Sequence, residues 1–282
     1  MANEGYTFKE IRKSRGLTQD DIVKNHISRV TLSKFENGKM VLSMSNFKYI
    51  LNAVDLTLEE FDFIKNGYSY DKKQDIITSF NNLFSNTNNE INDEIIKKCE
   101  VYLSENCSVS IKCIKNVMYM LNFLNNSSNE KVTCYTKIYA ADIWNELSVI
   151  DNWTLLDIKI INCCLHFFDK KSYLTISDML IKNLNKYKNF SNIILLETSV
   201  YLNLTILFLM NNELKQAKKF SSLSLSKSLE SKRIDYISLS MIRNGIICDK
   251  NSQIEKGLSL IEILNNKQLL EQINKEIAYF RT

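Results

Sequence analysis

Amphipathic segments, in which apolar residues recur at the spacing of an α-helix, fill most of the 282 residues. The chain contains no proline, and two of its six glycines lie beyond residue 67. Because proline and glycine interrupt regular helices, a chain with so few of them favours continuous helices. The pattern therefore predicts an all-α protein.

Residues 18–39 carry the most informative pattern: a short helix, a tight turn and a second short helix closed by glycine. Thr18 and Ser28 are suited to cap the two helices, because their hydroxyls can accept hydrogen bonds from first-turn N–H groups. Leu32 and Phe35 stand three apart and share one face of the second helix. This pattern predicts a helix-turn-helix.

Flanking segments complete a small domain. Thr7 with Glu10 predicts a capping box at the start of the first helix. A fourth helix is expected to begin near Ser43, and Thr57 with Glu60 is expected to cap a fifth. Five short helices of this kind can bury one small core between them.

Positive charge is concentrated in this part of the chain. Residues 1–48 hold nine Lys or Arg and five acidic residues, so their net charge of +4 equals that of the whole chain. Residues 49–282 therefore sum to zero. A basic surface beside a helix-turn-helix suits contact with phosphates. The alternative is a solvated basic face without a partner.

Three segments, Gly5–Lys13, Ser33–Gly38 and the proline-free Lys39–Ser43, share a pattern with one known family. Through them, residues 5–62 resemble the Cro/repressor-type helix-turn-helix. Within that type they are most similar to the Rgg/MutR (GadR) regulators of low-GC Gram-positive bacteria. The resemblance is weaker over the rest of the chain, where Trp153–Phe168 is similar to an Rgg segment.

The resemblance implies that the second helix of the motif reads DNA. The outward positions of that helix, which match the contacts to bases and backbone, are Arg29, Val30, Thr31, Ser33 and Lys34. Outside it, the expected DNA-binding set comprises Gln19 as a phosphate anchor, Arg15 and Lys39 as phosphate contacts, and Arg12 through an internal ion pair with Glu36. That ion pair would fix the first helix against the recognition helix.

The remaining three quarters of the chain predicts stacked helix pairs. We expect residues 1–66 to form the helix-turn-helix domain, residues 67–73 a linker, and residues 74–282 a tetratricopeptide-like α-solenoid. Helical segments are separated by clusters of Asn, Ser and Lys, and their pairs repeat at about 35 to 40 residues. The solenoid is expected to serve peptide sensing and dimerisation.

A solenoid offers a concave surface, which in the Rgg resemblance binds a short secreted signalling peptide. Asn162 and Asn203 lie within apolar helices, where an amide without a partner would be costly. Arg243 is the only charge in its apolar segment and could bind a peptide carboxylate. The alternatives are a hydrogen bond to a neighbouring helix for each Asn, and an ion pair with Asp235 or Glu197 for Arg243.

Signals for catalysis, metals and membranes are missing from the sequence. The seven cysteines form no CxxC pair and no zinc spacing, so they indicate core residues of a cytoplasmic protein. Cys163–Cys164 could sense oxidation, although their apolar surroundings favour a structural role. The apolar run Val200–Met210 is too short for a membrane span, and the polar N-terminus resembles no signal peptide. We expect no enzyme, cofactor or metal.

These observations favour a cytoplasmic, homodimeric, sequence-specific transcriptional regulator of the quorum-sensing type. Its expected partners are double-stranded DNA, a short signalling peptide and a second copy, with RNA polymerase as a further partner if the peptide acts without moving the protein off DNA. Two alternatives stay open. One is a peptide-independent DNA-binding repressor whose solenoid only dimerises, and the other is a protein-interaction module.

Overall fold

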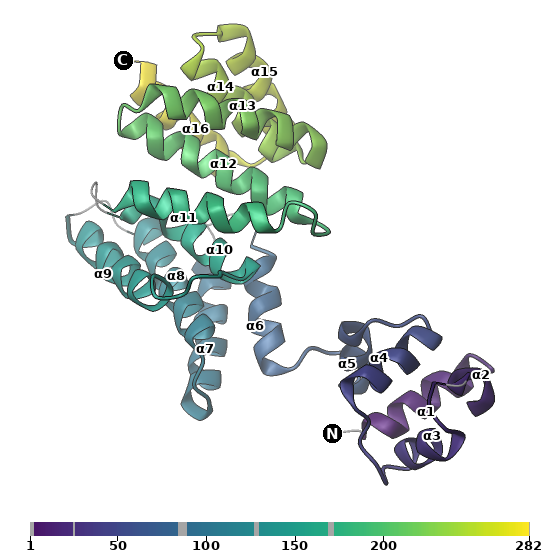
Figure 1. Cartoon of the computed structure of the whole chain (residues 1–282). Helices are drawn as coiled ribbons and strands as arrows, with labels where there is room; N and C mark the ends of the chain where they lie inside the picture. The colour runs from purple at the N-terminus through teal and green to yellow at the C-terminus, as the bar shows by residue number, and fades with distance from the viewer. Residues whose placement is uncertain (1–2, 25, 84–88, 127–129, 169–171, 282) are drawn as a thin grey trace. The chain divides into compact units, whose positions relative to one another are not determined.

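The computed structural model describes residues 3–24, 26–83, 89–126, 130–168 and 172–281. All regular structure in these ranges is helical, which confirms the predicted all-α class. The chain divides into two compact units, Met1–Asn82 and Leu83–Thr282 (Figure 1). The expected linker at 67–73 lies inside the first unit, and its boundaries stay a prediction.

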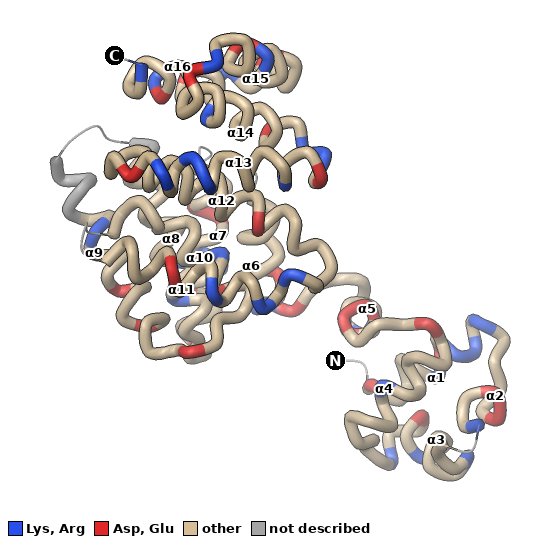
Figure 2. Tube along the Cα trace, turned by 45° about the horizontal axis from the view of Figure 1, so that its top comes forward, with Lys and Arg blue, Asp and Glu red and all other residues tan. Residues whose placement is uncertain are grey.

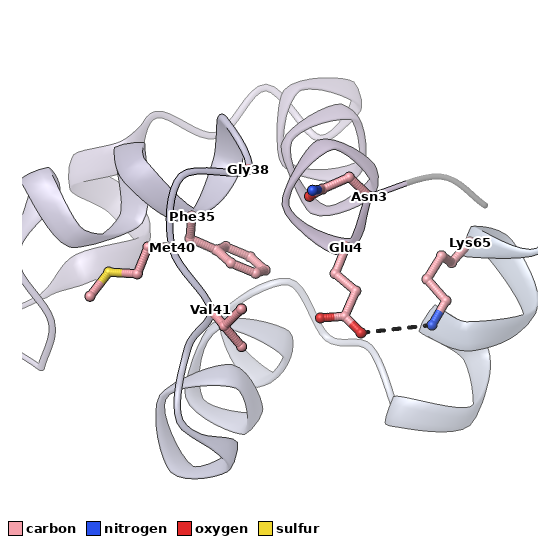
Figure 3. Close-up of a pocket in the computed structure, with 7 residues that line it drawn as sticks. All are labelled: Asn3, Glu4, Phe35, Gly38, Met40, Val41 and Lys65. Atoms are coloured by element: carbon pink, nitrogen blue, oxygen red, sulfur yellow. Dashed lines mark ion pairs between the residues drawn. The ribbon is translucent and has the colours of Figure 1, made fainter.

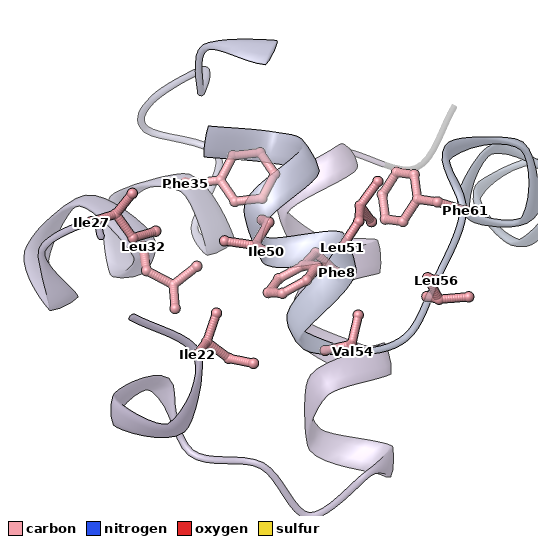
Figure 4. Packing of buried hydrophobic residues seen from close by; sticks show 10 residues of the cluster. All are labelled: Phe8, Ile22, Ile27, Leu32, Phe35, Ile50, Leu51, Val54, Leu56 and Phe61. Atoms are coloured by element: carbon pink, nitrogen blue, oxygen red, sulfur yellow. The ribbon is translucent and has the colours of Figure 1, made fainter. Parts of the chain in front are cut away.

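The first unit begins with five short helices that pack around one core. They are α1 (Glu4–Ser14), α2 (Gln19–Val23), α3 (Arg29–Glu36), α4 (Met44–Ala53) and α5 (Leu58–Lys65), followed by α6 (Lys72–Asn81). Helix α1 packs against α3 and α5, while α2 packs against α3 and α4. Figure 4 shows the cluster, in which Phe8, Leu32 and Phe61 are fully buried. The predicted five-helix arrangement is confirmed.

A side-chain cap fixes the start of each of these helices. Ser28 Oγ accepts from Thr31 N at 3.0 Å, and Thr18 caps α2 in a reciprocal box with Asp21. The predicted box of Thr7 with Glu10 is wrong, because α1 already begins at Glu4. Asn3 caps that helix by accepting from Gly5 N at 2.9 Å, and Thr7 is buried one turn inside it.

The second unit is a stack of helices in which neighbours in sequence lie side by side (Figure 1). Its elements are α7 (Asn89–Glu105), α8 (Val109–Asn126), α9 (Glu130–Leu147), α10 (Leu155–Cys164), η1 (Leu165–Phe167), α11 (Tyr173–Lys186), α12 (Ile193–Met210), α13 (Leu214–Ser231), α14 (Ile234–Ile247), α15 (Asn251–Ile263) and α16 (Lys267–Arg281). The tightest packing joins α12 to α13 and α14 to α15. The predicted helical-repeat architecture is confirmed.

Helix α12 runs through the middle of this stack. It is longer than the apolar run seen in the sequence, because it begins at Ile193. By length and composition alone it could cross a membrane, with a mean hydropathy of 1.9, but 61% of its residues are buried within the protein. It packs against α13 and α14. Its apolar character is therefore accounted for by the core of the helical unit.

Helix α1 approaches the end of α3 at Gly5 so closely that no side chain fits between them. A Cβ built on Gly5 would lie 1.8 Å from the carbonyl oxygen of Phe35 and 2.7 Å from its carbonyl carbon. Both of these atoms belong to the backbone, so they cannot rotate away. Glycine at this position therefore sets the distance between α1 and α3.

We expect Gly5→Ala to lower the free energy of unfolding of the first unit by about 3 kcal/mol, because α3 must shift to admit the methyl group. Both tryptophans, Trp144 and Trp153, lie in the second unit, so their fluorescence reports that unit alone. Circular dichroism should show an earlier transition while the tryptophan transition stays unchanged. Tyr6→Ala, at the exposed neighbouring position, should leave both transitions in place.

Candidate nucleic-acid interface

Helix α3 presents one face to solvent and the opposite face to the core. Leu32, Phe35 and Glu36 are buried. Arg29, Val30 and Lys34 are exposed, with Thr31 and Ser33 half-buried beside them. The five predicted reading positions are thus brought together on one short helix, whose basic residues are blue in Figure 2. Such a helix can offer hydrogen-bond donors and a methyl-bearing side chain to base edges.

Helix α3 is anchored on its inner side by one buried carboxylate. Glu36 Oε1 accepts from Arg12 Nε at 2.6 Å, and Oε2 accepts from Arg12 Nη2 at 2.8 Å. The side chains of Arg12 and Glu36 are 8% and 0% exposed. The hydrogen bond to Glu36 raises the pKa of Arg12. The internal ion pair that the resemblance implied is confirmed. The Arg12 guanidinium is therefore bound inside the domain.

Gln19 joins the same carboxylate, which the sequence did not indicate. Its Nε2 donates to Glu36 Oε2 at 2.8 Å, so the first residue of α2 is tied to the last residue of α3. Arg12 Nη1 also donates to the carbonyl of Leu17 at 2.6 Å. Helices α1, α2 and α3 therefore meet at Glu36. The phosphate-anchoring role of Gln19 stays a prediction.

Two further predicted contacts lie at the edges of this surface. Arg15 follows α1 and Lys39 follows the turn after α3, and both are exposed. Gly38 ends α3 with a φ of +69°, a left-handed conformation that glycine adopts without a steric penalty. Lys39 N then donates to the carbonyl of Lys34 at 2.8 Å, which fixes the turn.

A hollow of about 260 Å³ lies at the end of α3, and its lining also comes from the start of α1 and the end of α5 (Figure 3). Glu4 and Lys65 form an ion pair of 3.9 Å at its rim. Met40 and Val41 are 44% and 83% exposed. Its lining is Asn3, Glu4, Phe35, Gly38, Met40, Val41 and Lys65, a mixture that offers no set of metal ligands.

In the second unit, the two predicted asparagines contact each other. Asn203 Nδ2 donates to Asn162 Oδ1 at 3.1 Å and to the Asn162 carbonyl at 3.2 Å. Asn162 Nδ2 in turn donates to Ser199 Oγ at 2.9 Å. These bonds join α10 to α12. The alternative expectation of a hydrogen bond to a neighbouring helix is therefore confirmed for both residues.

Arg243 has a different partner from the two that the sequence suggested. Its Nε and Nη2 donate to the carboxylate of Glu276 on α16 at 2.8 and 2.9 Å. Its Nη1 donates to the carbonyl of Leu202 at 3.1 Å, next to Asn203. Asp235 pairs instead with Arg233, and Glu197 with Lys227. Residues 33 apart in sequence meet here, and no helical spacing could have predicted it.

His166 on η1 adds an unsatisfied atom to the surroundings of this pair. Its Nδ1 is buried and has no hydrogen-bond partner among the described residues. Burial lowers the pKa of His166 to about 4, assisted by the charge of Arg243. The imidazole is therefore neutral at neutral pH. In the sequence, two phenylalanines, Phe167 and Phe168, directly follow this histidine.

The adjacent cysteines Cys163 and Cys164 are held as thiols. Burial raises the pKa of Cys163 to about 11 and holds that of Cys164 well above its ordinary value. Because the thiolate is the reactive form, this environment does not favour the oxidation sensing considered for the pair. Within the described ranges, no group of three or more His, Cys, Asp or Glu is placed to hold a metal ion.

Residues 5–62 match a family model described as a helix-turn-helix domain. This segment is a helix-turn-helix domain. None of the curated proteins compared with the chain matches it.

Solved structures resemble the whole chain. A protein of Listeria monocytogenes EGD-e is 20% identical with a TM-score of 0.69, and the match covers 99% of this chain and 97% of that one. The SHP pheromone receptor Rgg2 of Streptococcus dysgalactiae is 12% identical with a TM-score of 0.66, covering 98% and 99%. PlcR of Bacillus thuringiensis, solved with the peptide PapR7 and DNA, is 15% identical with a TM-score of 0.64, covering 98% and 99%.

These likenesses extend over both units. They confirm that the resemblance to Rgg-type regulators, which the sequence carried mainly in its first 62 residues, holds for the fold of the full chain.

We expect Glu36→Ala to destabilise the first unit by about 3–5 kcal/mol, because it leaves the buried Arg12 charge without its partner. Glu10→Ala is the matched control, since Glu10 pairs with Lys13 on the exposed surface, where an ion pair contributes little. Chemical denaturation followed by circular dichroism measures both. A Glu36→Ala variant as stable as Glu10→Ala would contradict the anchoring role of this carboxylate.

Proposed function

We propose that this protein is a DNA-binding transcriptional regulator whose helical-repeat unit binds a short signalling peptide. The exposed face of α3 is the main observation in favour of DNA binding. Arg29, Val30 and Lys34 face outward on this helix, and Glu36 is fixed on its inner side. A rigid helix with donors on its free face suits the major groove. Net positive charge in residues 1–48 adds attraction to phosphates.

Dimerisation belongs to the same proposal. A single recognition helix reads only a few base pairs, and two-fold pairing supplies a second half-site about one helical turn away. The functional form is therefore a homodimer in the cytoplasm, with DNA as its main macromolecular partner. RNA polymerase is a further partner if the peptide changes transcription while the protein stays on DNA. A DNA-binding regulator of this fold requires no catalytic centre.

The peptide-binding part of the proposal rests on the second unit and on what the similar solved structures bind. Rgg2 is described as a pheromone receptor and PlcR was solved with a peptide, and both share the fold of the full chain. Asn162 of α10 and Asn203 of α12 bond each other, and Arg243 of α14 bonds the carbonyl of Leu202, the residue before Asn203. Amide and guanidinium groups of this kind can exchange their internal partners for the backbone and carboxylate of a peptide.

Arg29→Ala should weaken binding to the cognate site by about 1–3 kcal/mol and relax the base preference at one position of each half-site, since a bidentate contact to guanine is lost. Arg15→Ala should weaken binding evenly across sequences, because it removes a phosphate contact. Footprinting and titration of cognate and random duplexes separate the two effects. Equal losses on both duplexes for Arg29→Ala would show that it contacts only phosphate.

Asn203→Ala should weaken peptide binding by about fivefold or more, because one hydrogen-bonding amide is lost from the site. Calorimetry with short apolar peptides encoded beside the gene measures this. Asn183→Ala is the control: Asn183 is a buried amide that accepts from Trp153 N on another part of the unit.

Two outcomes would count against the peptide-binding part of the proposal. Tight binding that survives Asn203→Ala unchanged would reject the site. The sensing role would be rejected if no candidate peptide bound and if regulation stayed normal in a strain that lacks peptide import. The alternative function, a peptide-independent repressor, would then remain.

A further inference from the structure

An acidic side chain lies directly on the proposed reading surface. Asp20 Oδ2, in the first turn of α2, is 3.1 Å from Nη1 of Arg29, the first residue of α3. The two side chains are 64% and 66% exposed, so both face solvent beside the recognition helix. In Figure 2 the acidic first turn of α2 is red. A carboxylate here would stand close to the phosphates of bound DNA, where it is repelled.

The capping of α2 does not require Asp20. Asp21 performs that role, because its Oδ2 accepts from Thr18 N at 2.7 Å and from Thr18 Oγ1 at 2.6 Å. These hydrogen bonds lower the pKa of Asp21. Arg29 stands at the N-terminal end of α3, where the helix dipole disfavours a cation. The Asp20 carboxylate offsets that cost and limits the directions in which the guanidinium can point.

We propose that Asp20 is a positioning residue that sets base specificity through Arg29; this inference rests on the proposed function. The guanidinium has five N–H donors in a planar fork, and Asp20 engages one of its nitrogens. The remaining donors suffice for a bidentate contact with O6 and N7 of guanine. On DNA that offers Arg29 no such partner, the repulsion between Asp20 and phosphate is not offset. Asp20 therefore orients the reading residue and weakens binding to non-cognate sequences.

The test uses the full chain and the conservative variant Asp20→Asn, which keeps the shape of the side chain and removes its charge. Glu59→Gln, an equal charge change on the exposed surface of α5, is the control. The probes are a duplex enriched by the wild-type protein from a library with a randomised segment, and a scrambled duplex of the same composition. Dissociation constants for both probes give a specificity ratio.

Asp20→Asn should bind the scrambled duplex more tightly and the enriched duplex no more tightly, so that the specificity ratio falls about tenfold. Glu59→Gln should leave the ratio unchanged. A second enrichment with Asp20→Asn should lose the base preference at one position of each half-site. In an Arg29→Ala background, Asp20→Asn should no longer alter the ratio, because the residue it positions is gone.

Equal tightening on both duplexes would overturn the inference and reduce Asp20 to a general electrostatic effect. An unchanged ratio together with an unchanged base preference would overturn it as well, since the pair would then be a surface contact of no consequence. If the wild-type protein enriches no sequence at all, the proposed function itself fails, and this inference fails with it.

Discussion

The carboxylate of Glu36 is the constraint on which the first unit depends. It accepts hydrogen bonds from Arg12 and Gln19, and so joins α1, α2 and α3 at one buried point. An ionised group with less than one tenth of its surface exposed is tolerated only where its partners satisfy it. Satisfaction requires all three helices to be in place. The orientation of α3, and of every side chain on its outer face, follows from that requirement.

Buried and half-buried polar groups constrain the second unit in a similar way. Asn162 and Asn203 join α10 to α12, and the Arg243–Glu276 pair joins α14 to α16. Each tie selects one packing of helices whose apolar faces alone would permit others. A ligand that replaced one of these internal partners would prefer a different arrangement of the stack. Such differential binding is what a regulatory switch requires under the proposed function.

Local signals in the sequence predicted local structure well. Thr18 and Ser28 were identified as caps because a hydroxyl bonds to an N–H two or three residues away. The same logic failed at Thr7, where Asn3, one turn earlier, is the side chain that caps α1. The all-α class and the helical repeat followed from the lack of proline and the helical spacing of apolar residues.

Contacts between distant residues were predicted only in part. The family resemblance predicted the ion pair between Arg12 and Glu36. It did not predict the hydrogen bond of Gln19 to Glu36 or the ion pair of Arg243 with Glu276. These partners lie on helices whose relative placement is set by packing, and no spacing along the chain encodes it. The ion pair between Asp20 and Arg29 was not predicted, for a related reason. An acidic residue in a first turn is fully explained by the helix dipole, so nothing in the sequence indicated a second partner.

The most direct test of the central claim, that α3 and its basic surroundings bind duplex DNA, is the salt dependence of that binding. The dissociation constant of the full chain for an enriched duplex should be measured over a range of salt concentrations. The logarithm of the association constant should fall linearly with the logarithm of salt concentration. The expected slope is about −4 or steeper for a dimer whose copies each neutralise two or more phosphates. Binding that is absent at low salt, or that does not change with salt, would contradict it.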